Sequence, residues 1–448
     1  MRRSMIPTLL VAALAAAWSA GAQAADAQVA PAEAGRVAMA VDASNPARLA
    51  IGSRSPSCWS GFAAHLSDDD GATWRHGCTM WGTQDDEAPT DSPAVAFDSA
   101  GVLIAVQPMY WDSDGGSLRA ARSSNGGQSW DGWYTVGYSQ YLHGSILNAQ
   151  VEVDNAAASP NRGTVYASFT DDGWDVGSLS RIRVARSADG GRHWSSVSAT
   201  PEATGDEQLD FSDLAIDRRG NLFLSYMSCT GPQAECRGQA AELRLTRSTD
   251  GGQSWSAPAK LAAIQLPAGK SAIDTRLNND YGALPETKAA VSFSPVIAVD
   301  ATEGAWQNRL YAVMTTYADK RLQVLLSSSD DQGATWSAPR PVAAGPRAAD
   351  QFMPWVSVSR QGVVAVTWMD QRQHPKQPGY QAMVAFSKDG GATFGAPALL
   401  QGDASQPGKL KDLRGSASHA WTGKRLKTTF IGPDAAGKAS LRLSTTKP

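Results

Sequence analysis

Short apolar runs alternate with turn residues along almost the whole chain. In residues 92–106, SPAVAFDSAGVLIAV, one alternating run leads through a polar turn into a second run, and residues 117–123 supply a third. The same order returns in DLAIDRRGNLFLSY, in SPVIAVDATEGAWQNRLYAV and in MPWVSVSRQGVVAVTW. Period-two alternation predicts half-buried β-strands, and long helical periodicity is missing. The pattern therefore predicts an all-β protein made of repeated antiparallel units.

An octapeptide of the form S-x-D/N-x-G-x-S/T-W/F recurs six times, with copies 56 to 81 residues apart and His193 as the one departure in the third copy. An Asp or Asn side chain accepts hydrogen bonds from backbone N–H groups just downstream, Gly permits a positive φ, and the closing aromatic ring is an apolar anchor. We predict a structural turn between the third and fourth strand of each unit. A metal loop is the alternative, but the acidic residues are too few for a loop of the EF-hand type. The six Asp or Asn positions are Asp69, Asn125, Asp189, Asp250, Asp331 and Asp389.

Four-stranded units arranged radially form a β-propeller, which leaves no long exposed sheet edge. After Phe394 the segments GSASHAW, RLKTTFIG and ASLRLSTT supply three more strands without an octapeptide. We predict a single seven-bladed propeller over residues 25–448, in which the N-terminal segment near Val29 provides the last strand of the seventh blade. Six blades is the main alternative.

The first 24 residues have the pattern of a secretory signal peptide. Arg2 and Arg3 precede the apolar run LLVAALAAAW, and Ala22-Gln23-Ala24 is an A-x-A site. The run is too short for a spanning helix, so we expect cleavage after Ala24 and a secreted or periplasmic protein. No later apolar run is long enough to span a membrane.

Charge and cysteine content narrow the functional class further. The net charge of −3 does not indicate a nucleic-acid binder, and we expect a monomer. An even number of cysteines in an exported protein favours disulfides. We predict the pairs Cys58–Cys78 and Cys229–Cys236, since neither pair has other metal-ligating residues at a suitable spacing.

The octapeptide on a four-stranded unit is similar to the Asp-box, or BNR repeat. The chain therefore resembles the sialidase-like superfamily of propellers over nearly all of its mature length. The resemblance implies that the octapeptides lie on the face opposite the active site. It also implies three arginines for a sialate carboxylate, an Asp acid/base, and a Tyr nucleophile activated by Glu, because arginine forks bind carboxylates bidentately.

This sequence matches that machinery only in part. Arg36 takes the place of the Arg in the family's R-I-P segment, without the Pro, and Arg54 matches a second Arg. Residues 55–65 contain no carboxylate where the acid/base belongs. A Y-S-x-L-like nucleophile segment is missing near the C-terminus, where Tyr380 stands at a strand start, and Tyr138-Ser139 lies four blades too early.

The loops between second and third strands share one face of a propeller with the connections between blades. We call it the loop face, and the octapeptide side the turn face. Asp91, Asp210, Asp350 and Asp412 stand just before innermost strands, so we expect them to point toward the central channel. Paired carboxylates can act as acid and base on a sugar, and this chemistry requires no cofactor. Paired carboxylates can also hold Ca²⁺, which is therefore an optional ligand. For any single residue a solvated loop charge is the alternative.

Further candidates are spread over the same face. Tyr141 and His143, on the connection from blade two to blade three, suit either loop packing or proton abstraction from a uronate. Trp111 suits stacking on a sugar ring. The candidate catalytic residues are Arg36, Arg54, Asp91, Asp210, Asp350 and Arg414, and the candidate substrate-binding residues are Trp111, Asp112, Tyr141, His143 and Arg372.

Two functions are consistent with these observations. The first is an exported propeller that acts on or binds glycans, with an exo-glycosidase using a changed acid/base as its catalytic form. The second is a non-catalytic propeller that binds a protein or cell-envelope partner. The sequence does not decide whether the protein is an enzyme.

Overall fold

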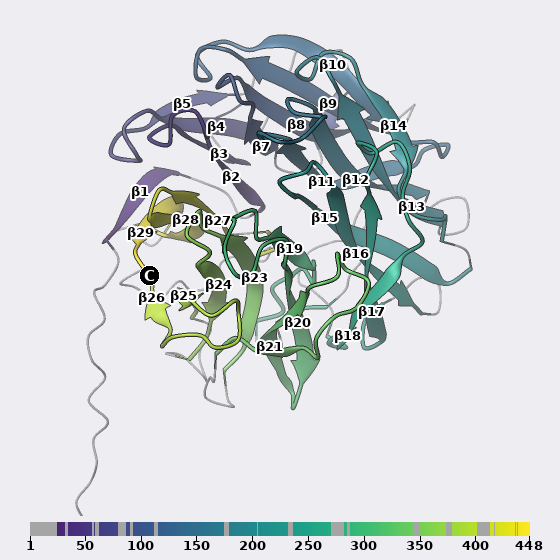
Figure 1. Cartoon of the computed structure of the whole chain (residues 1–448), viewed down its shortest axis with the longest axis vertical. Helices are drawn as coiled ribbons and strands as arrows, with labels where there is room; N and C mark the ends of the chain where they lie inside the picture. The colour runs from purple at the N-terminus through teal and green to yellow at the C-terminus, as the bar shows by residue number, and fades with distance from the viewer. Residues whose placement is uncertain are drawn as a thin grey trace, which may run out of the picture.

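The computed structural model is a seven-bladed β-propeller (Figure 1). It describes residues 25–31, 35–55, 58, 62–78, 87–89, 93–111, 115–173, 179–203, 205–231, 236–269, 282–284, 287–343, 349–372, 379–400, 413–415, 417–434, 436 and 438–448. In this part of the chain, seven antiparallel sheets surround one axis, so the prediction of seven blades is confirmed and the alternative of six is wrong. The described residues include no helix with the length and hydropathy needed to cross a membrane.

Each blade begins at the axis, as the ring of first strands in Figure 1 shows, and adds its strands outward in chain order, except that β1 from the N-terminus is the outermost strand of blade seven. Blade one contains β2 (Val37–Val41), β3 (Leu49–Arg54), β4 (Phe62–Ser67) and β5 (Arg75–Cys78), and blade two contains β6 (Glu87–Pro89), β7 (Ala94–Phe97), β8 (Leu103–Trp111), β9 (Gly115–Ser123) and β10 (Asp131–Tyr138). Blade three contains β11 (Ser145–Val153), β12 (Val165–Gly173), β13 (Leu179–Ser187) and β14 (Ser195–Ser198), and blade four contains β15 (Glu207–Ile216), β16 (Leu222–Thr230), β17 (Ala240–Ser248) and β18 (Ala259–Gln265). In blade two, β6 and β7 both pair with β8.

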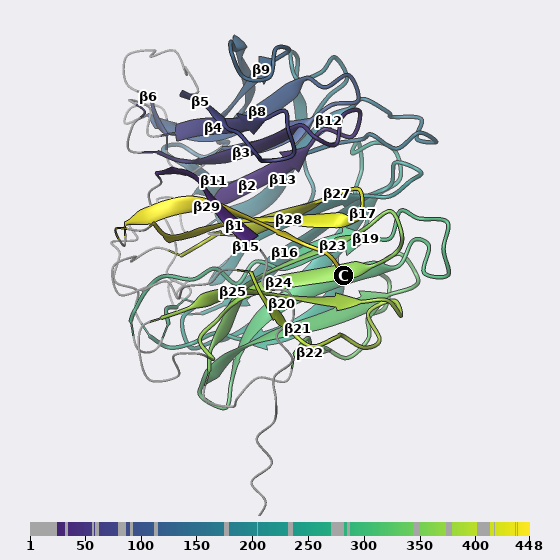
Figure 2. The ribbon, with the colours of Figure 1, turned by 90° about the vertical axis from the view of Figure 1, so that its left-hand side faces the viewer.

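The last three blades follow the same order. They contain β19 (Val296–Val299), β20 (Leu310–Ala318), β21 (Arg321–Ser329) and β22 (Arg340–Pro341); β23 (Gln351–Val358), β24 (Val364–Asp370), β25 (Gln381–Ser387) and β26 (Ala398–Leu399); and β27 (Ala417–Thr422), β28 (Arg425–Pro433), β29 (Ala439–Thr446) and the N-terminal β1 (Ala25–Pro31). The view at right angles in Figure 2 shows the blades edge-on, with the strands running between the two faces.

Strand β1 closes the ring, as predicted. It is the outermost strand of blade seven and pairs antiparallel with β29, from Ala25 opposite Thr445 to Pro31 opposite Ser440. Figures 1 and 2 both show it alongside β29. Arg442 donates to Asp26 at 2.7 Å across this pair. The two ends of the described chain therefore share one sheet.

The octapeptides are hydrogen-bonded turns between third and fourth strands. In the first copy Asp69 Oδ1 accepts from the Ser67 hydroxyl at 2.7 Å and from the Thr73 N–H at 2.8 Å, while the Thr73 hydroxyl donates to Oδ2 at 2.6 Å. In the third copy His193 replaces that hydroxyl, with its Nδ1 at 2.6 Å from Asp189 Oδ2. Both oxygens of these carboxylates are thus used within the turn, which supports the structural interpretation over a metal loop.

Each octapeptide also packs against the preceding blade, which explains its glycine and its aromatic residue. Gly71 has a φ of +89°, and a Cβ on it would lie 2.5 Å from Leu443 of blade seven. Gly333 has a φ of +83°, and its Cβ would lie 2.5 Å from Leu245 of blade four. Trp74 packs into the apolar cluster between blades seven and one. The octapeptide therefore joins neighbouring blades as well as strands.

Both predicted disulfides are present. Cys58–Cys78 closes a loop of 20 residues and Cys229–Cys236 one of 7 residues, with Cα–Cα distances of 5.3 and 5.9 Å. On chain-entropy grounds they stabilise the fold by about 3 and 2 kcal/mol. Cys58 lies between β3 and β4 and Cys78 ends β5, while Cys229 lies in β16 and Cys236 between β16 and β17, so both bonds fasten the loop face.

Candidate functional site

The first strands of the seven blades enclose a channel that is divided in two. Asp213, Val296 and Trp355 line both parts and separate them. Toward the loop face lies a small cavity of about 40 Å³, which we call the loop-face cavity. Toward the turn face lies a wider space of about 770 Å³, the turn-face chamber. Every blade contributes to the wall of the loop-face cavity, through Arg36, Pro93, Asn148, Asp213, Ser294, Met353 and Arg414 in the order of the blades.

Two arginines reach the loop-face cavity from neighbouring blades. Arg36 precedes β2 and Arg414 precedes β27. Gly415, with a φ of +63°, lets the two segments approach closely, because a Cβ there would lie 2.4 Å from Cγ of Arg36. The Val37 N–H donates to the Gly415 carbonyl at 2.8 Å, which fixes the start of β2 against blade seven. The cavity therefore has a cationic side built from blades one and seven.

A hydrogen-bonded chain orients Arg36 from the other blades. Its Nη1 donates to Asn148 Oδ1 at 3.1 Å, and Asn148 Nδ2 donates to Asp210 Oδ1 at 2.6 Å. Asp210 is buried and also accepts from the Thr170 hydroxyl at 2.7 Å. Asp210 was expected to point toward the channel, but it lies between blades three and four and is linked to the channel through Asn148.

Bulges interrupt first strands that line the cavity. The pairing register shifts between Leu147 and Gln150 in β11, and between Asp210 and Asp213 in β15. Asn148 and Phe211, within these bulges, have φ of +53° and +56°. Asn tolerates this region, whereas it strains a residue such as Phe. Asp210 accepts from Asn148 and Thr170 of blade three, whereas Asp213 accepts from Ile297 of blade five and lines the channel.

Asp213 is the buried carboxyl group of the loop-face cavity. Its Oδ2 accepts from the Ile297 N–H at 2.8 Å, which ties blade four to blade five. Burial raises its pKa to about 7, although that hydrogen bond and the positive charge of Arg36 act in the opposite direction. A carboxyl with this pKa can hold or release a proton near neutral pH.

Glu152 on β11 lies further along the channel, in the turn-face chamber. Its side chain is open to the chamber, but protein surrounds the chamber on all sides of the axis. This enclosure, and then the nearby charge of Asp213, raise the pKa of Glu152 to about 8. Two carboxyl groups of raised pKa therefore follow each other along the axis.

Asp350 and Arg372 have structural partners instead of a place in the described channel. Asp350 is fully buried, and its side chain accepts from the Leu322 N–H at 2.7 Å and from Arg321 Nη1 at 3.2 Å. Arg372 Nη2 donates to Asp370 at 2.6 Å, and the Trp368 indole donates to the same oxygen at 2.8 Å. These contacts fasten blade six internally and to blade five.

Tyr141 and His143 lie in the connection between β10 and β11, away from the axis. The Tyr141 hydroxyl donates to Glu202 at 2.6 Å and accepts from Arg181 Nε at 2.9 Å. Burial, and then the hydrogen bond to Glu202, raise the pKa of Tyr141 well above its usual value. A tyrosine held in its neutral form is a poor base, so this geometry favours loop packing over proton abstraction. His143 has a φ of +55° in the same turn.

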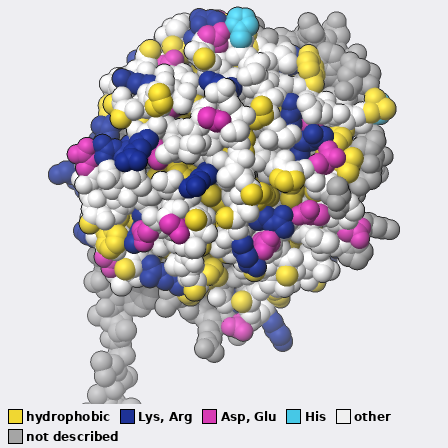
Figure 3. Space-filling model, turned by 45° about the vertical axis from the view of Figure 1, so that its right-hand side comes forward, with side chains coloured by type: hydrophobic (Ala, Val, Ile, Leu, Met, Phe, Trp, Pro, Cys, Tyr) yellow, Lys and Arg dark blue, Asp and Glu magenta, His cyan; other side chains and the backbone are white. Residues whose placement is uncertain are grey.

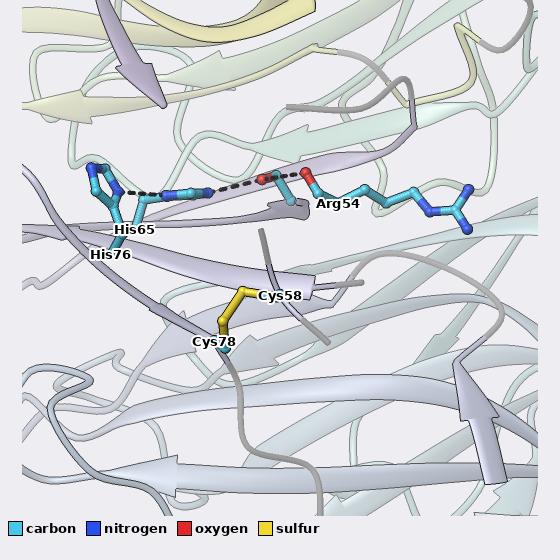
Figure 4. Close-up of a disulfide and its surroundings, with 6 residues drawn as sticks. Arg54, Cys58, His65, His76 and Cys78 are labelled. Carbon is cyan, nitrogen blue, oxygen red and sulfur yellow. Dashed lines mark hydrogen bonds between the residues drawn. A yellow bond between two sulfur atoms is a disulfide. The ribbon is translucent and has the colours of Figure 1, made fainter. Parts of the chain in front are cut away.

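Arg54 ends β3, the second strand of blade one, and is not among the residues that line the loop-face cavity. Figure 4 shows its side chain extending away from a chain of polar groups in which His65 contacts Ser53 Oγ at 2.9 Å and His76 at 2.8 Å. Burial lowers the pKa of His65 to about 3. Ser53 is fully buried, so its hydroxyl cannot meet a substrate.

Several predicted residues lie outside the described part of the chain. These are Asp91, Asp112 and Asp412, together with the side chain of Trp111, whose backbone ends β8. Within the described ranges, no three His, Cys, Asp or Glu residues come together as a metal site. On the face shown in Figure 3, acidic and basic side chains are interspersed.

No family model matches the chain, and no curated protein matches it. Solved structures do match. The leech intramolecular trans-sialidase superposes with a TM-score of 0.50 at 11% identity, over 76% of this chain and 65% of that chain. The chain has the fold of the sialidase-like propellers.

Two other solved structures are similar over more of their own length. A Hadza microbial sialidase has a TM-score of 0.49 at 14% identity, over 91% of this chain and 74% of that chain. An α-L-arabinofuranosidase from Fusarium graminearum has a TM-score of 0.47 at 15% identity, over 79% of this chain and 92% of that chain. At these identities the likeness concerns the fold alone, and the site must be judged from its own residues.

Proposed function

We propose that this protein is an exported glycan-acting propeller whose site is the loop-face end of the channel. In this proposal Arg36 and Arg414 bind an anionic group of a terminal sugar, and Asp213 is the proton donor that replaces the acid/base missing from residues 55–65. One observation carries the proposal: two arginines and a carboxyl group with a pKa near 7 line the same cavity, into which all seven blades converge.

The size of the cavity supports exo-action. At about 40 Å³ it is much smaller than a cavity of about 150 Å³, which is large enough to hold a benzene ring. A single carboxylate or hydroxyl group fits there, and a sugar ring does not. The ring would lie above the cavity, on the loop face, with one substituent inserted toward the arginines. Arginine suits a carboxylate because its planar fork donates two parallel hydrogen bonds.

Chemistry at this site would need a protonated acid near neutral pH. Asp213, with its pKa raised to about 7, retains its proton at pH 6 and can give it to a leaving-group oxygen. The second carboxylate of a glycosidase pair would come from the loop face, where Asp91 remains a candidate. Export is supported by the two disulfides, which persist in oxidising compartments.

The test is turnover of a fluorogenic panel of sialosides and neutral glycosides by the protein, with Arg36→Ala and Asp213→Asn beside it. Arg360→Ala, which removes an exposed cation on the turn face, is the matched control. We expect sialoside cleavage that falls about 100-fold or more in Asp213→Asn, and that declines above pH 7 in the unmodified protein as Asp213 loses its proton.

Other outcomes separate the remaining possibilities. Binding on a glycan array without turnover, lost in Arg36→Ala, would leave a sugar-binding propeller at the same site. Neither turnover nor glycan binding would contradict the proposal and favour a propeller that binds a protein or envelope partner.

A further inference from the structure

The turn-face chamber has the size and lining of a ligand site. Its volume of about 770 Å³ lies within the range of about 300–1,000 Å³ that small-molecule pockets occupy. Turns between first and second strands form its mouth, so it opens on the face opposite the proposed glycan site. Its wall mixes polar and apolar groups. The apolar part includes one alanine from each of four blades and indole rings from two more: Ala40, Ala96, Ala215, Ala298, Trp355 and Trp421.

Glu152 is the charged group inside this wall. Among the described residues, none donates a hydrogen bond to its carboxylate or forms an ion pair with it. Its neighbour Asp213 differs, because Asp213 accepts from the Ile297 N–H and is close to Arg36. The side chain of Glu152 is exposed to the chamber, and its charged neighbour is the carboxyl group of Asp213. A cation that enters the chamber would therefore be attracted to Glu152.

The other titratable groups that face the chamber do not supply a positive charge that pairs with Glu152. His419 on β27 bonds Ser357 at 2.7 Å and Thr367 at 2.9 Å, and burial lowers its pKa to about 3, so it stays neutral. At the mouth, Arg218 pairs with Glu303 at 2.7 Å, and Arg360 is exposed. Asp42 and Asp217 are buried at strand ends, where their oxygens accept backbone N–H groups.

We propose that the turn-face chamber binds a small organic cation, a protonated amine or quaternary ammonium, with Glu152 as its counterion and the apolar part of the wall around its carbon groups. Indole faces attract such cations, and Trp355 and Trp421 are in the wall. A metal ion fits less well, because it needs several oxygen ligands and the described residues bring no such group together. The proposal concerns the opposite end of the channel from the glycan site and does not depend on it.

Two properties of binding follow from the position of Glu152. Because enclosure keeps its carboxyl protonated up to a pKa of about 8, binding of a cation at pH 7 must release a proton. The affinity should therefore rise with pH up to about pH 8, by about tenfold per unit at most. Glu152 is exposed to the solvent of the chamber, so its attraction for a cation is screened by salt. Added salt should therefore weaken binding.

The experiment is isothermal titration calorimetry of the full chain with benzyltrimethylammonium at pH 7.5, in two buffers of different ionisation enthalpy. Benzenesulfonate and Ca²⁺ are the comparison ligands. Glu152→Gln keeps the shape of the side chain and removes the charge, while Glu303→Gln removes an exposed acid at the mouth and is the matched control. We expect proton release in the unmodified protein and in Glu303→Gln, and a Kd raised about tenfold or more in Glu152→Gln without proton release.

Two results would overturn the proposal: failure of the unmodified protein to bind benzyltrimethylammonium at millimolar concentration, and equal affinity of Glu152→Gln and the unmodified protein for this ligand. Tighter binding of Ca²⁺ than of the ammonium would assign the chamber to a metal instead. Thermal unfolding of Glu152→Gln checks that it folds, and we expect a melting temperature no lower than that of the unmodified protein, since the amide carries no charge into the chamber.

Discussion

At the scale of single residues, the channel depends on side chains that the sequence pattern did not single out. Asp210 stood out because it precedes an innermost strand, whereas Asp213 and Glu152 sit inside the apolar stretches FSDLAI and VEV. Alternation places residues three apart on opposite sides of a strand, as found for Asp210 and Asp213, but it does not show which side lines the channel. Arg36 was found through the family pattern, and Arg414 through its place in the connection before blade seven. Neither prediction depended on alternation along a strand. The remaining candidates on the loop face lie in long loops, whose conformation is not determined by local sequence patterns.

Asp213 should make stability depend on pH in a defined direction. Its pKa is about 7 in the folded protein and near 3.8 when unfolded, so the folded state binds the extra proton between these values. The resulting stability is fully present below pH 4 and is lost as pH rises through 7. We expect Asp213→Asn to be more stable than the unmodified protein at pH 8, and to lose this advantage at pH 5.

Thermal unfolding between pH 5 and pH 9 measures this difference, with Glu303→Gln as a control for an exposed acid. An Asp213→Asn variant whose melting temperature runs parallel to that of the unmodified protein at every pH would show that Asp213 ionises normally.

At the scale of elements, the octapeptide turns were predictable in full because they are local. All their hydrogen bonds join residues within four positions, so residue type and spacing suffice. The same argument applies to a second set of turns between first and second strands that we did not predict. There, Asp98 Oδ1 accepts from the N–H groups of Ala100 and Val102, and Asp217 Oδ1 accepts from Arg219 and Asn221. The signal was present as an Asp at the end of five inner runs, at Asp42, Asp98, Asp154, Asp217 and Asp300.

Removing one octapeptide carboxylate should measurably weaken the fold. Asp389 accepts from the Ser387 hydroxyl at 2.7 Å and from the Thr393 N–H at 2.8 Å, and Asp389→Ala leaves these donors to water. We expect a loss of about 1–2 kcal/mol in urea unfolding, and almost none for the neighbouring Lys388→Ala.

The stability difference between Asp389→Ala and the unmodified protein should decrease at acidic pH. The hydrogen bonds, first that of the Thr393 hydroxyl, lower the pKa of Asp389 to about 2 from the ordinary 3.8. Its contribution is therefore present above pH 4 and is lost as pH falls through 2. Equal stability of Asp389→Ala and Lys388→Ala at pH 7 would show that the turn does not depend on the carboxylate.

At the scale of the whole molecule, the blade number and the closure of the ring followed from counting strands. Six octapeptides mark six blades, and the three strands after Phe394 need a fourth, which β1 supplies. Closure removes the free edge that β29 would otherwise present. What the count could not give is the division of the channel, because that depends on which side chains the bulged inner strands turn toward the axis.

The position of β1 can be tested by moving it. Ala25 pairs with Thr445, so the start of β1 lies beside the end of β29. We expect a circular permutant that begins at Gly35 and carries residues 25–31 after Pro448, through a short turn, to match the melting temperature of the unmodified protein. Deletion of residues 25–31 should lower the melting temperature and promote association through the exposed edge of β29. A deletion variant that stays monomeric with an unchanged melting temperature would contradict this role for β1.

The ion pair between Arg442 and Asp26 joins residues 416 positions apart, and this separation matters during synthesis. The ribosome makes β1 first and β29 last. At about 5–20 residues per second, β1 waits roughly 20–80 s before its partner exists. A chain that stops short of β29 leaves β1 unpaired and the ring open to proteases and chaperones. Ring closure thus works as a check on chain completeness: only a full-length product can bury its own beginning.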